Sequence, residues 1–202
     1  MFFNDLFHQV VFSDEKVFQS FSNGHVLVKR KRGEANNLKY INFAIQQEKF
    51  SVNVWCCISY NKKVIVKLAG SNFNSVNYIN LIDECFKNDF EDFQNNYCFQ
   101  QDNASIHKSS EVLDYFKREK LMVLRWPPCS PDLNIAENIW SEIQKKLTKY
   151  LFKNKVRNEN DLFIVIKRIA ESIEIQFINK LYDTIKNRLE EVIKNKGGFT
   201  SY

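Results

Sequence analysis

The feature that most constrains the fold of this chain is a change in hydrophobic period along its length. Up to residue 68, apolar residues occur in short β-branched runs typical of strands. Between residues 69 and 126, stretches with helical spacing alternate with two further strand-like runs, and beyond residue 126 only helical spacing occurs. This order predicts an α/β fold, with a mixed sheet, flanking helices and a helical C-terminal part.

The individual elements follow from local pattern. Strands are predicted at residues 10–13, 17–21, 26–30, 51–59, 63–68, 97–101 and 121–126. A turn at residues 22–24 (Ser-Asn-Gly) would join residues 17–21 and 26–30 into a hairpin, followed by a long loop over residues 31–49. Helices are predicted around Val76–Phe86, Val112–Phe116, Ile139–Leu147, Leu162–Ile173 and Ile178–Ile193.

Composition excludes several classes of protein. The chain has 202 residues, 44% of them hydrophobic, which indicates one globular domain over residues 1–202. Only 5 Gly and 3 Pro are present, which excludes collagen-like and linker-like chains. The 5 Cys are odd in number and lack Cys-x-x-Cys spacing, so we expect reduced thiols in an intracellular protein.

Charge and hydropathy limit the partners. No apolar run approaches the length needed to span a bilayer, and the N-terminus is a poor signal peptide, so we expect no membrane partner. The net charge of +5 permits a nucleic-acid partner without requiring one. The densest basic run, Lys-Arg-Lys-Arg at residues 29–32, is alone more typical of a solvated surface.

Three acids occupy positions suited to chemistry. Asp14 and Asp102 each follow a predicted strand, and Glu137 lies in the first turn of a predicted helix. If the two strands are neighbours, these carboxylates can share one cleft, where they would raise each other's pKa unless cations neutralise them. Oxygen ligands favour Mg²⁺ or Mn²⁺, and two such ions can promote phosphodiester cleavage.

Each acid also has a purely structural interpretation. Asp14 could simply end a strand, and Asp102 could form a turn or an Asx cap. Asn134 and Glu137 have the spacing of a capping box, with Asn134 as N-cap and Glu137 at N3. The pattern alone leaves these alternatives open.

Four blocks of sequence carry a resemblance to a known family. They are VVFSDEKVF at residues 10–18, SVNVWCCIS at 51–59, QQDNASIHKS at 100–109 and WPPCSPDLNIAENIWSEIQKKL at 126–147. With these blocks, and a gap of 34 residues between Asp102 and Glu137, the chain resembles the catalytic domain of mariner-superfamily transposases, in the branch whose third acid is Glu. The ending VIKNKGGFTSY at residues 192–202 is also similar to that family.

The resemblance implies a ribonuclease H-like fold, with Asp14, Asp102 and Glu137 as a catalytic triad that holds two Mg²⁺ or Mn²⁺ ions. It implies cleavage of double-stranded DNA at the ends of an element, followed by strand transfer to target DNA. It further implies a homodimer, formed through the loop at residues 22–50, and a nuclear location. No small-molecule substrate is expected.

Other residues are assigned by the same resemblance or by their context. His107 matches a family histidine that could orient a phosphate or an acid, although a polar loop histidine is an equal alternative. Trp126 is expected to shape the loop before Glu137, and Trp55 and Trp140 are expected in the core. The resemblance raises the odds that the basic run at residues 29–32 meets DNA phosphates.

The chain departs from the family pattern in three respects. Ile135 stands where the family usually has Pro, so the placement of Glu137 should loosen. Cys56 stands where Gly is common, and its thiol could crowd the neighbouring backbone. The 13 residues before Asp14 could not form a helix-turn-helix, so we expect that DNA-binding module to be absent.

Two other functions remain open from the sequence. One is a catalytically silent or domesticated transposase remnant that binds DNA or protein. The other, less favoured, is a ribonuclease H-type nuclease that cleaves RNA–DNA hybrids.

Overall fold

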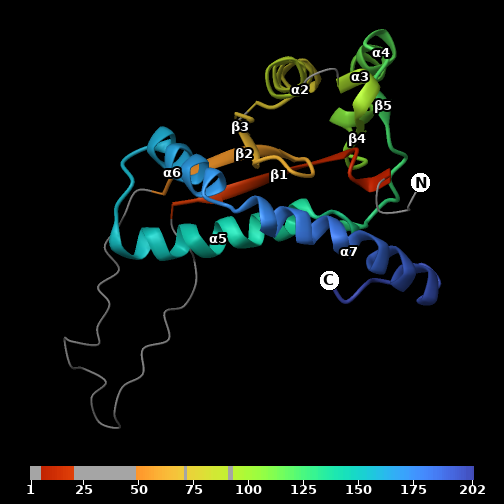
Figure 1. Ribbon diagram of the computed structural model, residues 1–202. Coiled ribbons are helices and arrows are strands. Elements are labelled where there is room, and N and C mark those ends of the chain that lie inside the picture. The colour runs from red at the N-terminus through yellow and green to blue at the C-terminus, as the bar shows by residue number, and fades with distance from the viewer. Residues whose placement is uncertain (1–5, 21–48, 71, 91–92) are drawn as a thin grey trace.

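A five-stranded mixed sheet forms the centre of the molecule. The computed structural model describes residues 6–20, 49–70, 72–90 and 93–202 (Figure 1). The strands are β1 (Val10–Gln19), β2 (Ser51–Ile58), β3 (Ile65–Leu68), β4 (Cys98–Gln100) and β5 (Met122–Val123). Their order across the sheet is β3-β2-β1-β4-β5, so β1 is central. The predicted α/β mixed sheet is confirmed.

The pairing of β1 combines the two strand orientations. It runs antiparallel to β2, with Asp14 opposite Cys56, and parallel to β4, with Phe12 opposite Gln100. The antiparallel β2–β3 pair and the parallel β4–β5 pair complete the sheet. Asp14 and Asp102 therefore come from neighbouring strands, as the sequence argument required, and each lies two residues beyond the Phe12–Gln100 pair.

The predicted end of the first strand at Asp14 is wrong. β1 continues through Asp14 to Gln19 and includes most of the run at residues 17–21, which was predicted as a separate strand. Its second half pairs with β2 as far as the Gln19–Ser51 pair, and this tertiary pairing overrides the turn-like Ser-Asp-Glu sequence. The predicted turn at residues 22–24 and the strand at 26–30 lie outside the described residues.

Helices cover the sheet on both faces (Figure 1). The α-helices are α2 (Ser75–Asp89), α3 (Phe93–Asn96), α4 (Ser110–Arg118), α5 (Ala136–Lys153), α6 (Glu159–Glu171) and α7 (Ile175–Lys194). Two short 3₁₀ helices, η2 (Ile106–Lys108) and η3 (Pro131–Leu133), precede α4 and α5. The predicted helices are confirmed, with α3 as an additional short turn.

The two faces of β1 bury different cores because side chains alternate along a strand. Val10, Phe12 and Phe18 pack beneath α5, α6 and α7, whereas Val11 packs with residues of α2 and α4. Consecutive residues of β1 therefore face different helical layers. This alternation decides the surroundings of Asp14 and of Glu15, the residue that follows it.

Local signals in the sequence begin and end the helices. Asn74, Ser109 and Asn158 accept a hydrogen bond from the backbone N–H three residues ahead, as N-cap side chains do. After α7, Asn195 is the C-cap, and Lys196 and Gly197 then adopt positive φ values of 52° and 88°, which turn the chain away from the helix.

The cysteines are unpaired, as the sequence predicts. All five cysteines are free thiols, four of them buried, and Cys57 and Cys85 have their sulfurs 3.4 Å apart. Cys56 packs in the core beneath α5 without interrupting the pairing of β1 with β2. Among the described residues, no helix is long and apolar enough to cross a bilayer.

Candidate active site

Asp14 projects from the middle of β1 towards α5. The indole Nε1 of Trp140, on α5, donates a hydrogen bond to Asp14 Oδ2 at 2.9 Å. Burial, reinforced by the negative charge of Glu137, raises the pKa of Asp14 to about 7. Asp14 is therefore only partly ionised at neutral pH, and a neighbouring cation would stabilise its charged form.

Glu137 lies in the first turn of α5, as predicted. Its side chain is 45% exposed, and its carboxylate is 4.0 Å from the Lys16 ammonium group. Lys16 lies two residues after Asp14, so alternation along the strand places the Lys16 side chain on the same face of β1 as Asp14. Glu137 is close enough to Asp14 for its negative charge to contribute to the raised pKa of Asp14.

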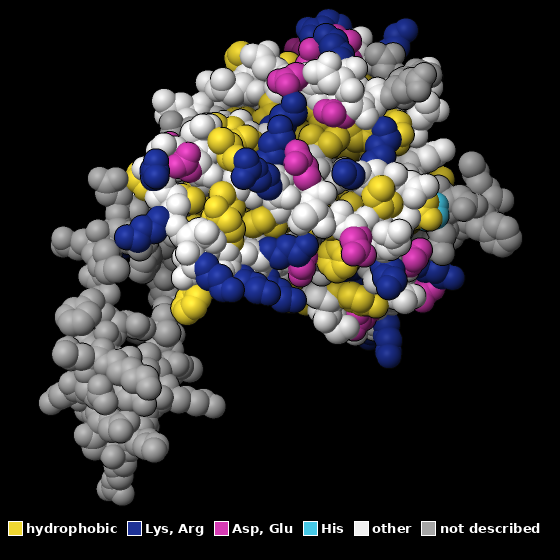
Figure 2. All heavy atoms as spheres, turned by 60° about the vertical axis from the view of Figure 1, so that its left-hand side comes forward, with side chains coloured by type: hydrophobic (Ala, Val, Ile, Leu, Met, Phe, Trp, Pro, Cys, Tyr) yellow, Lys and Arg dark blue, Asp and Glu magenta, His cyan; other side chains and the backbone are white. Residues whose placement is uncertain are grey.

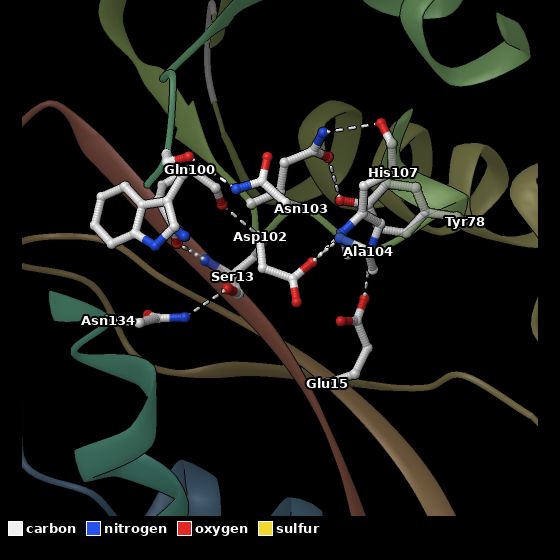
Figure 3. A network of polar contacts seen from close by, with 11 residues as sticks. Ser13, Glu15, Tyr78, Gln100, Asp102, Asn103, Ala104, His107 and Asn134 are labelled. Carbon is white, nitrogen blue, oxygen red and sulfur yellow. Dashed lines mark hydrogen bonds and ion pairs between the residues drawn. The ribbon is translucent and has the colours of Figure 1, made fainter. Parts of the chain in front are cut away.

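The capping-box interpretation of Glu137 is wrong. Asn134 Oδ1 does accept a hydrogen bond from the Ala136 N–H at 3.0 Å, but the N–H of Asn134 donates to Pro131 O instead of to a Glu137 carboxylate. Asn134 also donates from Nδ2 to Ser13 O at 3.1 Å (Figure 3), which ties the start of α5 to β1 beside Asp14. Helix capping therefore does not occupy the Glu137 carboxylate.

Ile135 replaces the proline of the family pattern, a change expected to loosen the placement of Glu137. The Ile135 side chain is fully buried in the core beneath α5, next to Ala136. Apolar packing at this position thus anchors the start of α5 in place of the helix-favouring proline of the family pattern.

Asp102 lies just beyond the end of β4 and makes the predicted Asx turn. Its Oδ1 accepts a hydrogen bond from the Ala104 N–H at 2.8 Å and also contacts His107 Nδ1 at 2.7 Å (Figure 3). The bond to His107 lowers the pKa of Asp102 below its usual value. Asp102 is therefore ionised at neutral pH, in contrast to the partly protonated Asp14.

His107 is buried between two acids, so the loop-histidine interpretation is wrong. Its Nε2 is 3.2 Å from Glu15 Oε1, and its ring lies against Tyr78 with the ring centroids 4.4 Å apart. Burial alone would lower the pKa of His107, but its bonds to Asp102 and Glu15 outweigh burial and raise this pKa to about 9. His107 thus holds a positive charge that links Asp102 to Glu15.

Contacts between β1 and β4 hold the two aspartates in a fixed relation. Ser13 Oγ donates to Gln100 O at 2.8 Å, and the Ser13 N–H donates to Gln100 Oε1 at 3.2 Å (Figure 3). Beyond β4, Asn103 Nδ2 donates to Trp126 O at 2.8 Å, in agreement with the expected role of Trp126 in shaping the following loop. Trp126 also packs edge-on against Phe12.

The three predicted acids are not assembled as a ready-made metal site. Among the described residues, no three His, Cys, Asp or Glu side chains converge closely enough to hold an ion. Asp14 lies near Glu137, while the nearest acid linked to Asp102 is Glu15, through His107. The donor set nevertheless fits a hard divalent cation, because each of the three carboxylates has acceptor capacity beyond the contacts described.

Sequence reasoning missed two contributors to this region. The sequence does not mark Glu15 as part of the site, because a strand predicted to end at Asp14 leaves Glu15 outside it. Alternation along the longer strand directs Glu15 to the face opposite Asp14. Trp140 was correctly expected in the core, where it is fully buried, but its bond to Asp14 was not foreseen. The indole N–H of a buried tryptophan usually finds an acceptor, and this rule was the available signal.

Comparison with known proteins decides the family. A model of the DDE superfamily endonucleases matches residues 9–163, which is most of the chain. The chain belongs to the DDE superfamily endonucleases. It is a DDE-type transposase catalytic domain, homologous to Tc1/mariner transposases, and the resemblance seen in the sequence is confirmed.

Individual relatives agree with this assignment. The chain is 28% identical over 194 residues to the Tc1 transposase of Caenorhabditis elegans, which covers 95% of this chain and 70% of that protein. The catalytic domain of Mos1 mariner transposase superposes with a TM-score of 0.69 at 14% identity, over 98% of this chain and 86% of that one. The Mos1 paired end complex with Mg gives a TM-score of 0.72 at 16% identity, over 96% and 57% respectively. These structural matches confirm the ribonuclease H-like fold.

Proposed function

We propose that this chain cleaves double-stranded DNA at the ends of a transposable element and joins the freed 3′ ends to target DNA, with Mg²⁺ or Mn²⁺ held by Asp14, Asp102 and Glu137. The observation that carries the proposal is the burial of the Asp14 carboxylate near the negative charge of Glu137; burial first, and Glu137 second, raise the pKa of Asp14 to about 7. A cation bound between Asp14 and Glu137 would relieve the repulsion between the two carboxylates, and this relief would add to the free energy of metal binding. When bound, two divalent ions supply charge stabilisation and an activated water.

The residues around the acids have separate tasks in this proposal. Trp140 donates to Oδ2 of Asp14, so Oδ1 is the oxygen of that carboxylate that would face a metal. His107 holds Oδ1 of Asp102, so Oδ2 is the oxygen of that carboxylate that would face a metal. Lys16, 4.0 Å from Glu137, would move towards a DNA phosphate when a metal takes its place beside that carboxylate.

The partners follow from the substrate. The similarity to Mos1 paired-end complexes, one of them with the left transposon end, supports transposon DNA and a second transposase copy as partners of this chain. A homodimer through residues 22–50 belongs to the proposal, although residues 22–48 lie outside the described residues. Because the substrate is chromosomal DNA, we also propose a nuclear location, which a fluorescent fusion excluded from nuclei would contradict.

The decisive experiment measures metal binding and DNA nicking on the same samples. Calorimetry with Mg²⁺ or Mn²⁺ and nicking of supercoiled plasmid are compared between the wild type and Asp102→Asn. We expect the wild type to bind metal and nick, and the variant to lose both. A matched control is Asp114→Asn, an exposed acid on α4 whose nearest cation is Lys117 at 3.5 Å, which should leave both unchanged.

Other outcomes separate the alternatives. A folded wild type that binds no metal and does not nick would contradict the proposal and support the silent remnant. Cleavage of RNA–DNA hybrid without cleavage of duplex DNA would instead support a ribonuclease H-type nuclease.

A further inference from the structure

We propose that Arg188 and residues 200–202 form a clamp that positions Glu137 by fixing the junction between η3 and α5. The members of this tail clamp are Asp132, Asn138, Arg188, Thr200 and Tyr202. The inference concerns the same site as the proposed function and rests on it. The clamp itself, however, can be tested on the metal-free protein.

Arg188 is the centre of the clamp. Its side chain lies on α7 and is only 2% exposed. One guanidinium nitrogen, Nη1, donates to Asp132 O in η3 at 2.6 Å, and the other, Nη2, donates to Asn138 Oδ1 in α5 at 2.8 Å. A third donor, Nε, bonds Thr184 Oγ1 at 3.0 Å within α7. The planar fork of one side chain therefore joins three segments of the chain.

Residues 200–202 contact Arg188 and Asp132 from the protein surface. The Tyr202 ring covers the guanidinium group of Arg188, whose central carbon is 4.6 Å from the ring centroid. The N–H of Thr200 donates to Asp132 Oδ2 at 2.7 Å, so the backbone of the tail binds the residue whose carbonyl Arg188 holds. Asp132 is thus hydrogen-bonded through its main-chain carbonyl to Arg188 and through its side chain to Thr200.

The clamp acts next to the candidate acid. Asn138, which accepts from Arg188, directly follows Glu137 in α5, and Asp132 belongs to η3, which leads into that helix. On the other side of Glu137, Asn134 bonds Ser13 O and fixes the same junction against β1. The first turn of α5 is therefore held between β1 and α7, and the direction of the Glu137 side chain depends on both attachments.

Arg188 does more than fill the space between α7, η3 and α5. The hydrogen-bond acceptors of the buried guanidinium group, a carbonyl, an amide and a hydroxyl, are all uncharged. Apolar residues of similar volume usually fill such a place at least as well as a buried charge. What an apolar side chain cannot supply is the rigid set of bonds that fixes the angle between α7, η3 and α5.

The test uses Tyr202, because this residue is 47% exposed and its replacement leaves the core intact. Tyr202→Ala removes the ring over Arg188, whereas Tyr202→Phe retains it. Phe199→Ala is the matched control, since Phe199 belongs to the same tail and its side chain is 73% exposed. Two readouts are compared: hydrogen exchange of peptides covering residues 130–140 without metal, and the single-turnover nicking rate at saturating DNA.

We expect Tyr202→Ala to accelerate exchange in residues 130–140 about threefold to tenfold and to lower the nicking rate by a similar factor, the range for loss of one partly exposed cation–π contact. The affinity for DNA and exchange in the central strands should not change. Tyr202→Phe and Phe199→Ala should both match the wild type. Thr200→Pro, which removes the N–H that binds Asp132, should reproduce the Tyr202→Ala result.

Several outcomes would overturn the clamp. Unchanged exchange at residues 130–140 in both Tyr202→Ala and Thr200→Pro would do so, as would accelerated exchange spread evenly over the whole protein. A lower nicking rate in Phe199→Ala equal to that of Tyr202→Ala would also contradict it. If the wild type fails to nick, the proposed function fails, but the exchange measurement still decides the clamp.

Discussion

Replacing Asp14 with asparagine should make the metal-free protein more stable at alkaline pH. Burial, with Glu137 nearby, raises the pKa of this carboxyl from 3.8 to about 7 in the folded protein. A carboxyl with a raised folded-state pKa favours folding while it is protonated. Its ionisation therefore costs stability as the pH rises from about 4 through about 7.

The size of the effect follows from that shift. About three pKa units at about 1.4 kcal/mol each give a ceiling of about 4 kcal/mol at pH 8. Water penetration and local relaxation lower such values, so we expect Asp14→Asn to gain about 1–3 kcal/mol. For a chain of this size, 2 kcal/mol corresponds to an increase in Tm of about 4–8 °C. The asparagine oxygen can still accept the bond from Trp140.

The measurement is urea unfolding in the presence of a chelator at about pH 4.5 and pH 8. The advantage of Asp14→Asn should be large at pH 8 and small at pH 4.5. Asp102→Asn provides a control of opposite sign, because the bond to His107 lowers the pKa of Asp102. Ionised Asp102 stabilises the fold above its unfolded pKa and loses this effect as the pH falls. A variant at Asp14 that is no more stable than wild type at pH 8, or equally advantaged at both pH values, would refute the reasoning.

Three further predictions concern Trp140, Glu15 and Tyr182. Trp140→Phe removes a donor that stabilises ionised Asp14, so the acidic limb of the nicking-rate pH profile should move to higher pH. Glu15→Gln should lower the pKa of His107 from about 9, as measured by NMR titration of the imidazole. Protonated His107 stabilises the fold, and this stabilisation disappears as the pH rises through its pKa, so in the variant it should disappear at a lower pH than in the wild type. Tyr182→Phe should cost about 1–3 kcal/mol in urea unfolding, because the buried hydroxyl contacts Val10 O at 2.7 Å and Ile58 O at 2.9 Å.

Much of the fold could be predicted because its signals are local. The helical spacing of residues such as Ile139 and Ile143 is set by which face meets the core, and both are fully buried. Strand β2 was likewise visible as a continuous apolar run, and it is paired on both edges. The adjacency of β1 and β4, by contrast, was only a condition of the sequence argument. β2, β3 and α2 lie between these strands along the chain, and β3, the strand before α2, is not a neighbour of β4 in the sheet.

The site was less predictable, because its geometry depends on pairing between distant segments. The extent of β1 is decided by residues 51–58, which no local pattern around Asp14 reveals. The burial of His107 between Glu15 and Asp102 depends on the register of β1 against β4. The triad itself remains a prediction, carried by the family resemblance and by the electrostatic effect of Glu137 on Asp14.

The alternation along β1 has a genetic consequence. Asp14 faces α5, whereas Glu15 faces His107 on the other side of the sheet. Loss of a single codon before Asp14 would move every following side chain of the strand to the opposite face. Such a copy would keep its reading frame, all three acids in order and nearly unchanged composition, yet direct Glu15 towards α5 and Asp14 away from it. Under the proposed function, short in-frame deletions in this strand should therefore inactivate copies of the element that look intact when only their acidic residues are compared.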